Sequence, residues 1–583
     1  LIIVLSARIM RSLWLTALLP LAAADWQFKS RPDLAPPRLN ITIPAAPDVE
    51  KGYLFVAPFA GFADEAGEMH GPRQAAPYIF RDDGELVWSG YGYYSIWATN
   101  FQKARWKGKD ILFSFEGDHN AGYGHGHGHT TILDQHYETI RELRAGNHKL
   151  TDKHEFHIIN EETALIQIYQ PVPKDLTRWG ASPEQQWIVD AIIQGNHQRP
   201  MSIERKTKPG IELDIETGEL LFEWSSLDHV LPDEAILPIN PGQAGSGYNS
   251  SDAWDYFHIN SVDKDSEGNY LISARDACAV HKINGSTGEI IWRLGGVKSD
   301  FDLGPNVKFC FQHHARFVSR DGDKEVISLY DNSAHGTENG RGSEVHTHPF
   351  SQGKIIEVNT AIWKASIVQA FQPPDGLLSK SQGSTQLLPN GNVLVNWGSE
   401  GALTEFRPDG TPIFHTYMDS GLLGLGVENY RGFRYNWTGL PNETPAIVSL
   451  ENDQGTTVYV SWNGDTETKV WRFYQVTDEY GSRQYLGETK RTGFETSFAL
   501  KAGTVHTVAA EAIGANGRVL TSTGIVKTQA EILPPVKGAE APSSISLSDK
   551  MQQPQVYLGQ TSRWEEHMIL KVDRFHLDST TSP

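Results

Sequence analysis

Histidines begin several hairpin-like segments of the chain, and histidine is a residue that can act as a nucleophile or bind an anion. The run "FQHHARF" places His313 beside His314 on an apolar strand. His154 begins "HEFHIINEETALIQIYQ", and His258 begins "HINSVDKDSEGNYLISAR". Because side chains alternate along a strand, His314 faces away from His313, and we interpret His314 as a packing residue. The other three histidines are candidates for chemistry.

Each candidate has a predicted neighbour across its hairpin, since residues equally far from an antiparallel turn face each other. Reflection about the turn "KDSEGN" puts His258 opposite residue 276, within one position of Arg275. The same construction gives three further assignments: His313 with Asp331, His154 with Tyr169, and Trp397 at the matching place in the hairpin 383–399.

These residues would form one ring if the first strand of every hairpin lined a common axis. Such a ring suits an anion carried on an aromatic or other flat group. Arg275 offers a planar set of donors for a tetrahedral oxyanion. Asp331 could hold His313 in one tautomer, and Trp397 could stack on a ring. A single histidine on a strand can also be purely structural, but the recurrence at equivalent positions favours a site.

The elements that would hold the ring follow a repeat. The segments "DDGELVW" (82–88), "ETGELLFEW" (216–224) and "STGEIIW" (286–292) each place a glycine turn before an apolar strand that ends in Trp. A hairpin precedes each of these tails. Two strands, a turn and two more strands, repeated with insertions, predict a six-bladed β-propeller over residues 50–440. An array of β-sandwiches is the alternative.

The pattern changes near residue 441. Short alternating strands separated by turns predict a small immunoglobulin- or fibronectin-like β-sandwich over residues 441–530. Residues 531–583 are rich in Pro and Ser and are typical of a linker or disordered tail. The predicted fold class is therefore all-β, a six-bladed β-propeller followed by a β-sandwich.

The composition narrows the class of partner. The chain has 583 residues and a formal charge of −20, which argues against nucleic acid because nucleic-acid binding needs a basic face. The abundance of Trp, Tyr, Phe, Gly and Pro suits a large all-β protein.

The first residues suggest secretion. We interpret residues 1–24 as upstream residues plus a signal peptide: Met10 begins it, "LWLTALLPL" is the apolar run, and Ala22–Ala24 form the cleavage site. The alternative, a membrane anchor, is disfavoured by Pro20 and by the short length. We expect an extracellular glycoprotein without a membrane anchor, with glycosylation sequons at Asn40, Asn249, Asn284, Asn436 and Asn442.

The chain has two cysteines, Cys278 and Cys310. In an oxidising compartment a disulfide between them is a possibility, and two separate buried thiols are the alternative. Cys278 follows Arg275 by three positions and Cys310 precedes His313 by three, so a bridge would tie two neighbouring blades beneath the proposed ring.

The stretch "HNAGYGHGHGHTT" contains His125, His127 and His129 in alternation. On one strand these side chains would share a face and could bind a metal. We favour the alternative, a loop or strand end whose glycines allow close approach to the channel. The prediction therefore includes no metal ligands and no cofactor.

The motifs "HINSVDKDSEGNYLISARDACAVHKINGSTGEIIWRLGG", "FQHHARF", "SLYDNSA" and "QLLPNGNVLVNWGSEGALTEF" resemble the arylsulfotransferase family, particularly its fungal secreted branch. The resemblance covers most of residues 50–440. It implies a six-bladed propeller, often with a small extra β domain. It also implies transfer of a sulfuryl group from a phenolic sulfate donor to a phenolic acceptor through a histidine-bound intermediate, without phosphoadenosine phosphosulfate.

Matched motif by motif, the resemblance makes His313 the nucleophile, His258 and Arg275 oxyanion-binding residues, and His154 a further active-site histidine. Tyr169, Asp331 and Trp397 then become candidate substrate-binding residues. Two other functions stay open. One is a propeller lyase or cyclase that acts on an anionic metabolite or sugar, and the other is a non-catalytic glycan-binding module.

Overall fold

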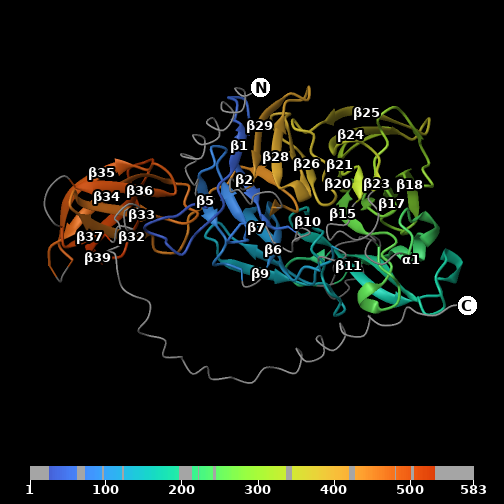
Figure 1. Cartoon of the computed structure of the whole chain (residues 1–583), viewed down its shortest axis with the longest axis horizontal. Helices are drawn as coiled ribbons and strands as arrows, with labels where there is room; N and C mark the ends of the chain where they lie inside the picture. Colours follow the sequence, from blue (N-terminus) through green and yellow to red (C-terminus); the bar gives the residue numbers. More distant parts are fainter. Residues whose placement is uncertain are drawn as a thin grey trace, which may run out of the picture. The chain divides into compact units, whose positions relative to one another are not determined.

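The computed structural model describes residues 25–61, 72–94, 97–120, 124–195, 213–218, 220, 222–239, 244–335, 345–418, 427–478, 481–500 and 505–531. The predicted signal peptide and nearly all of the predicted tail lie outside these ranges. The described residues form mainly β-strands (Figure 1). Their one α-helix is a single turn, α1 (Ser226–His229), and their 3-10 turns are η1 (Thr177–Trp179), η3 (Pro232–Glu234), η4 (Ser250–Asp252) and η5 (Gly398–Glu400).

Six sheets of four or five strands, antiparallel except for one short edge pairing, succeed one another along the chain. The first three, with their strands in spatial order, are β31 (Phe433–Tyr435), β2 (Tyr53–Val56), β4 (Tyr78–Phe80) and β5 (Leu86–Ser89); β6 (Ala98–Trp106), β7 (Lys109–Gly117), β8 (Gly128–Leu133) and β9 (Thr139–Leu143); and β10 (Phe156–Ile159), β11 (Thr163–Pro173), β12 (Trp187–Gly195) and β14 (Phe222–Ser225), with β13 (Leu213–Asp214) paired to β11.

The other three sheets continue the same order. They are β15 (Ile259–Lys264), β16 (Tyr270–Ala274), β17 (Ala279–Ile283) and β18 (Ile290–Gly295); β20 (His313–Asp321), β21 (Lys324–Asp331), β24 (Gln352–Asn359), β25 (Lys364–Phe371) and β19 (Asp302–Leu303); and β26 (Ser384–Leu387), β27 (Val393–Asn396), β28 (Ala402–Phe406), β29 (Pro412–Tyr417) and β1 (Asn40–Ile43).

Neighbouring sheets touch in sequence order. Contacts run from β2 to β6, from β6 to β10, from β10 to β15, from β15 to β20 and from β20 to β26, and β27 contacts β31 of the first sheet. The succession of contacts thus returns to its start, while none of the described sheets closes on itself. In Figure 1, where colours follow the sequence, the sheets appear in order from blue through green to amber.

Two pairings join the two ends of this succession. β31, which follows the sixth sheet, pairs with β2, and β1 pairs with β29. Figure 1 shows blue β1 beside amber β29. β31 therefore takes the edge position of the first sheet and leaves β2 as the second strand.

Local turn chemistry sets the register of the hairpin that carries His258. The carboxylate of Asp265 accepts the backbone N–H groups of Glu267 at 2.9 Å and Asn269 at 2.8 Å, and Gly268 has φ +89°. An Asx turn with a left-handed glycine closes β15 onto β16. This register shifts by one position at a bulge between Ile259 and Ser261, and the N–H of Arg275 then donates to the His258 carbonyl at 2.9 Å.

The tryptophan at the end of each repeated tail is a core residue. Trp88, Trp224 and Trp292 are each at most 1% exposed. Large aromatic side chains contribute strongly to burial, so these tryptophans help to hold the outer strands to the packed interior.

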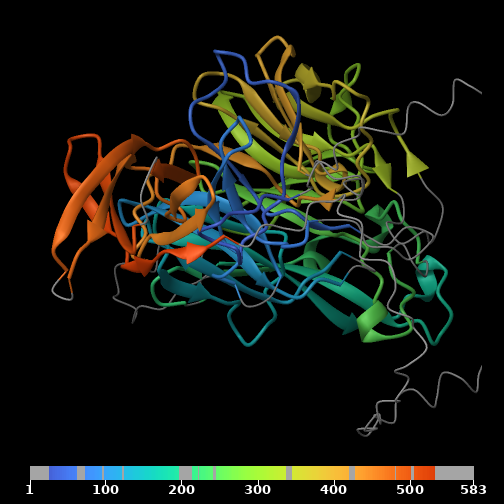
Figure 2. The ribbon, with the colours of Figure 1, turned by 60° about the vertical axis from the view of Figure 1, so that its left-hand side comes forward.

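The C-terminal strands form two further sheets, drawn in orange and red in Figure 2. One contains β36 (Glu495–Leu500), β33 (Gly455–Ser461), β32 (Ala446–Asn452) and β40 (Gln529–Ala530), and the other contains β35 (Arg483–Lys490), β34 (Thr468–Val476), β37 (Thr507–Gly514), β38 (Val519–Ser522) and β39 (Val526–Lys527). Their shared core includes Val460, Trp471, Phe473 and Val508. Two small sheets complete the fold: β3 (Phe59–Ala60) with β30 (Val427–Glu428), and β22 (Ala334–His335) with β23 (Val345–His346).

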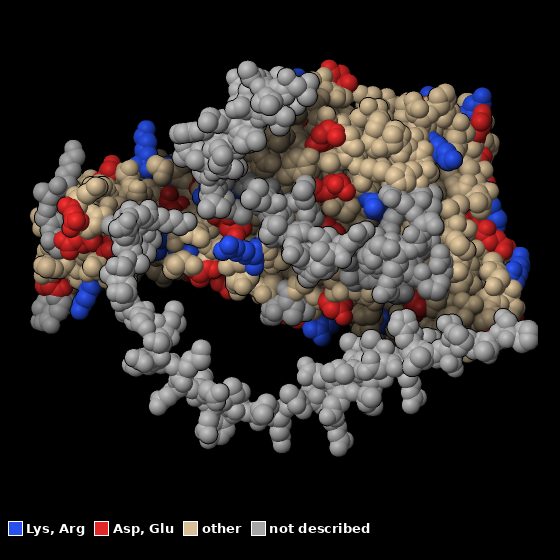
Figure 3. Space-filling view, in the orientation of Figure 1, with Lys and Arg blue, Asp and Glu red and all other residues tan. Residues whose placement is uncertain are grey.

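Acidic and basic side chains are interspersed over the described part of the face in Figure 3. Of the predicted glycosylation positions, Asn40, Asn249, Asn436 and Asn442 are exposed and Asn284 is half-buried.

Candidate active site

Three buried histidines each direct the ring atom Nδ1 at a neighbouring acceptor. His154 pairs with Asp152, His258 with Asp255 at 2.6 Å, and His313 with the side-chain oxygen of Asn332 at 2.7 Å. An acceptor at Nδ1 selects the tautomer that carries its proton there. The second ring atom, Nε2, is then left with its lone pair, which is the form in which imidazole acts as a nucleophile or base.

Ring contacts connect the three histidines through His154 and Tyr430. The ring centroids of His154 and His258 are 4.9 Å apart, and the Tyr430 ring lies 5.4 Å from His154 and 6.5 Å from His313. Residues from three consecutive sheets therefore meet in one place.

His313 is held in a neutral state. Its side chain is buried, and this burial together with the nearby Arg275 guanidinium holds its pKa well below the usual value, despite the hydrogen bond that His313 donates to Asn332, which acts in the opposite direction. Nε2 accepts the backbone N–H of Gln382 at 3.2 Å. The lone pair on Nε2 of His313 is thus present, but it accepts a weak hydrogen bond from the Gln382 backbone N–H.

Arg275 is fixed by three acceptors. Its guanidinium donates to Asp276 at 2.7 Å, to the Lys380 carbonyl at 3.1 Å and to Nδ1 of His335 at 3.0 Å. Burial and the charge of Arg275 lower the pKa of His335 to about 3, so His335 is a neutral acceptor. The guanidinium is therefore oriented before any ligand arrives.

Asp331 does not orient His313. A β-bulge at the start of β20, where His314 has φ +54°, sets His313 opposite Tyr330. Asp331 instead pairs with Lys354 at 2.7 Å and accepts the N–H of Cys310 at 3.1 Å. The expected role belongs to Asn332, because the bulge moves the register by one position.

Trp397 does not line the site either. It is fully buried in an apolar cluster with Phe371 and Phe406, and its indole N–H donates to Thr404 at 2.7 Å. The Trp397 ring packs edge-on against Tyr330, so it has no face available for a substrate.

Tyr169 does reach the histidines. Its ring lies 5.5 Å from that of His154 and 5.3 Å from that of His258, and its hydroxyl donates to the Ile259 carbonyl. Because its hydroxyl is already hydrogen-bonded, Tyr169 contributes the surface of its aromatic ring to the site.

The histidines of the His-rich stretch separate. Nε2 of His125 lies 2.8 Å from Asp255, next to His258. His127 is exposed near Asp118, and His129 lies 3.6 Å from Glu116. His125 forms an isolated bridge with Asn120 before β8 begins. The three alternating histidines therefore do not lie on one strand face.

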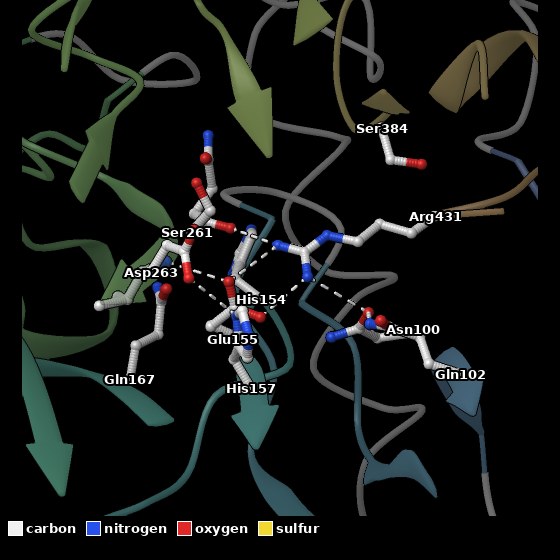
Figure 4. Close-up of polar contacts among 12 residues, drawn as sticks. Asn100, Gln102, His154, Glu155, His157, Gln167, Ser261, Asp263, Ser384 and Arg431 are labelled. Atoms are coloured by element: carbon white, nitrogen blue, oxygen red, sulfur yellow. Dashed lines mark hydrogen bonds and ion pairs between the residues drawn. The ribbon is translucent and has the colours of Figure 1, made fainter. Parts of the chain in front are cut away.

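A charged layer adjoins the histidines. Glu155 is fully buried and pairs with Arg431 at 2.9 Å and Arg316 at 2.7 Å; Figure 4 shows Arg431 directed at Glu155. Burial raises the pKa of Glu155, but the two guanidinium groups outweigh it and bring the pKa to about 2. The carboxylate is thus ionised.

A cavity of about 480 Å³ is lined by residues that include His157, His314 and Arg316. None of the three clustered histidines lines it.

Cys278 and Cys310 form a disulfide, with their Cα atoms 4.4 Å apart. It links the residues after β16 to those before β20, close in sequence to Arg275 and His313. The bridge therefore ties the fourth sheet to the fifth beside the site.

Several site residues were not predicted: Asp152, Asp255, Asn332, Gln382 and Tyr430. Two of them carry a signal in the sequence, since an aspartate stands two positions before His154 and three before His258. Such spacings let a carboxylate fold back onto an imidazole. Gln382 and Tyr430 reach the site only through tertiary structure.

A model of the family described as Arylsulfotransferase (ASST) matches residues 102–419, which is more than half of the chain. The chain belongs to this family. The match spans the segments that carry His154, His258, Arg275 and His313. Membership in the arylsulfotransferase family assigns the chain aryl sulfotransferase activity in general terms, with a small-molecule aryl donor and acceptor.

Other comparisons add little to the family assignment. A Bacteroides caccae protein of unknown function is 12% identical with a TM-score of 0.34, covering 65% of this chain and 97% of its own. Kuenenia stuttgartiensis hydrazine synthase is 10% identical with a TM-score of 0.29, covering 62% and 79%. These scores are too low to support an argument, and no curated protein matched. None of the described helices is long and apolar enough to cross a membrane.

Proposed function

We propose that this arylsulfotransferase moves a sulfuryl group from a phenolic sulfate ester to a phenol, with Nε2 of His313 as the nucleophile. The observation that carries the proposal is the state of His313: it is buried, neutral, and oriented at Nδ1 by Asn332. A neutral imidazole with its proton fixed on one nitrogen is ready to react through the other.

In the first half-reaction Nε2 attacks the sulfur of the donor, the N–S bond forms, and the S–O bond to the aryl group breaks to release a phenolate. The imidazole becomes cationic, and Asn332 accepts the N–H that then carries part of the charge. Arg275 and the Gln382 N–H stabilise the sulfuryl oxygens, since transfer of such groups depends on positioning and on donors aimed at the equatorial oxygens.

In the second half-reaction a phenol oxygen attacks sulfur, and the N–S bond breaks to restore neutral His313. We assign the phenol's proton to His154. Burial and the neighbouring cationic groups hold the pKa of His154 well below its usual value, and its Nδ1 faces Asp152. This Asp–His pair has the arrangement of a general base.

We further infer that the six sheets are the blades of a six-bladed β-propeller in the region 50–440, followed by the β-sandwich of residues 441–530. The return of sheet contacts from β27 to β31 supports this. The clustered histidines then lie at the strand starts, around the axis where propellers place their sites.

We also propose that the protein is secreted and glycosylated. The apolar segment before Asp25, the exposed sequons and the disulfide all suit an oxidising extracellular compartment.

The test is trapping of the intermediate. The protein is incubated with 4-nitrophenyl sulfate without acceptor, digested without acid, and analysed by mass spectrometry for a sulfuryl adduct on the "FQHHARF" peptide. His313→Ala is expected to abolish the adduct and to lower turnover by about a thousandfold or more. His506→Ala, which changes an exposed histidine, is the control. Undiminished turnover in His313→Ala would remove His313 from the mechanism.

A further inference from the structure

Three ligand-type atoms outside the transfer step converge beside the site. Nε2 of His125 lies 2.8 Å from Oδ2 of Asp255, and Nδ1 of His258 lies 2.6 Å from the same oxygen. All three atoms are within 4.8 Å of one another. They come from two separate segments: His125 precedes β8, whereas Asp255 and His258 precede β15.

The carboxylate of Asp255 is held in one orientation. Its other oxygen, Oδ1, accepts the backbone N–H of His258 at 3.0 Å, so only Oδ2 faces the two imidazoles. Asp255 is 2% exposed and His258 is 6% exposed. His258 also has φ +50°, a conformation that is uncommon for a residue with a side chain and that concentrates at functional sites.

His125 is the accessible member of the group. Its ring is stacked on Tyr169, with the centroids 4.1 Å apart and the planes inclined by 21°. The side chain is 14% exposed, which leaves an approach from solvent. The nearby Arg275 is paired with Asp276 at 2.7 Å, so its charge is largely balanced within that pair.

Two arrangements fit this geometry. In the first, each imidazole donates its own N–H to Oδ2 of Asp255. In the second, one metal ion replaces both protons and binds the two nitrogens and the oxygen. We propose that His125, Asp255 and His258 bind a divalent transition-metal ion through Nε2, Oδ2 and Nδ1. Two imidazoles and a carboxylate suit a metal of intermediate softness such as Zn²⁺, and three protein ligands leave a position for water or a substrate oxygen.

The metal would change what His258 offers to a ligand. With a proton on Nδ1, neutral His258 presents only a lone pair at Nε2. With metal on Nδ1, the proton resides on Nε2, and His258 becomes a hydrogen-bond donor. This consequence rests on the proposed function, because a donor there stabilises a sulfuryl oxygen, whereas the metal site itself does not depend on it.

The test uses the tag-free full chain, freed of metal with a chelator and titrated with Zn²⁺ by calorimetry in buffers of different ionisation enthalpy. We expect uptake of about one zinc ion per chain, with release of protons. His125→Ala is expected to weaken zinc binding by at least about tenfold. His127→Ala, which removes an exposed imidazole of the same stretch, is expected to bind like the unchanged protein.

Cobalt substitution gives a second readout that does not require a folded ligand variant, since Co²⁺ in a nitrogen- and oxygen-ligated site has visible absorption. Absence of zinc uptake and of a cobalt spectrum would overturn the proposal and leave the proton-bridged cluster. Equal weakening by His125→Ala and His127→Ala would also overturn it. Zinc uptake with no effect on 4-nitrophenyl sulfate turnover would support the metal site and reject only the link to His258.

Discussion

The six-sheet region and the C-terminal two-sheet region bury different chemistry. Among the described residues of the six-sheet region, His154, Glu155, Arg275, His313 and Arg431 are all buried. The described residues 446–530 bury Asp465 as their one charged side chain, around a core of Trp471 and Phe473. Beside its apolar clusters, the six-sheet region thus buries charged groups that must be matched to one another, whereas the C-terminal region buries almost none.

The backbone differs in the same way. Non-glycine residues with positive φ lie throughout the site: His258, Cys278, Phe311, His314, Ser333 and Gln382. None is found in the described part of 446–530. Such conformations cost free energy and persist where the surroundings enforce them. The contrast indicates that the first region gives up stability for the placement of side chains, and the second does not.

The largest expected effect on stability is that of Glu155→Gln. Removing one partner of a buried ion network leaves guanidinium charge unpaired, so we expect the free energy of unfolding to fall by about 3–5 kcal/mol. Glu488→Gln is the matched control, since its pair with Arg472 is exposed, and we expect a change within about 1 kcal/mol. Urea denaturation measures both, and equal losses would contradict the contrast.

Acidification is expected to weaken the six-sheet region. Burial lowers the pKa values of His154 and His313, so the unfolded chain binds protons there that the folded protein does not. Stability therefore falls as pH drops below about 6.5, by up to about 1.4 kcal/mol per pH unit for each histidine. Urea titrations from pH 7.5 to about 5.5 measure this slope. His313→Asn is expected to reduce it, and an unchanged slope would contradict the assignment.

Gly383→Ala has the next largest expected effect. Gly383 has φ +105°, and a Cβ there would overlap the ring of Tyr330. We expect a loss of about 1–3 kcal/mol and reduced turnover, because Gln382 moves with it. Gly517→Ala is the control in the other region: its φ is +76°, but no atom lies within 4 Å of the added Cβ. Thermal melts should show the greater loss for Gly383→Ala.

The smallest expected effect is that of Ile513→Val in the C-terminal core. Losing one buried methylene should cost about 0.5–1.5 kcal/mol. Turnover of 4-nitrophenyl sulfate should not change, since Ile513 lies on β37 of the C-terminal sheets, opposite Val470, and not on a segment that carries the histidines. A loss of activity at unchanged stability would show that the two regions are coupled.

Hairpin symmetry in the sequence placed His258 within one position of Arg275, the difference being a bulge between Ile259 and Ser261, and it brought His154 near Tyr169. The prediction failed at His313, where a bulge at the left-handed residue His314 shifts the register. As a result Asn332, and not Asp331, accepts the hydrogen bond from His313. The prediction also failed for Trp397, whose side chain enters the apolar layer. Asp152 and Asp255 could have been predicted, because each lies two or three positions before a site histidine. Gln382 and Tyr430 lie on distant segments, which sequence periodicity does not locate.

The pairing of β31 with β2 has a consequence for biosynthesis. A ribosome delivers β2 early, but its edge partner β31 emerges only after the strands of the other five sheets have been translated. Until then β2 presents unpaired backbone groups, which invite association with other chains. A nascent chain that stops before Phe433 would therefore leave this edge open, and its retention by chaperones should end once β31 has been made.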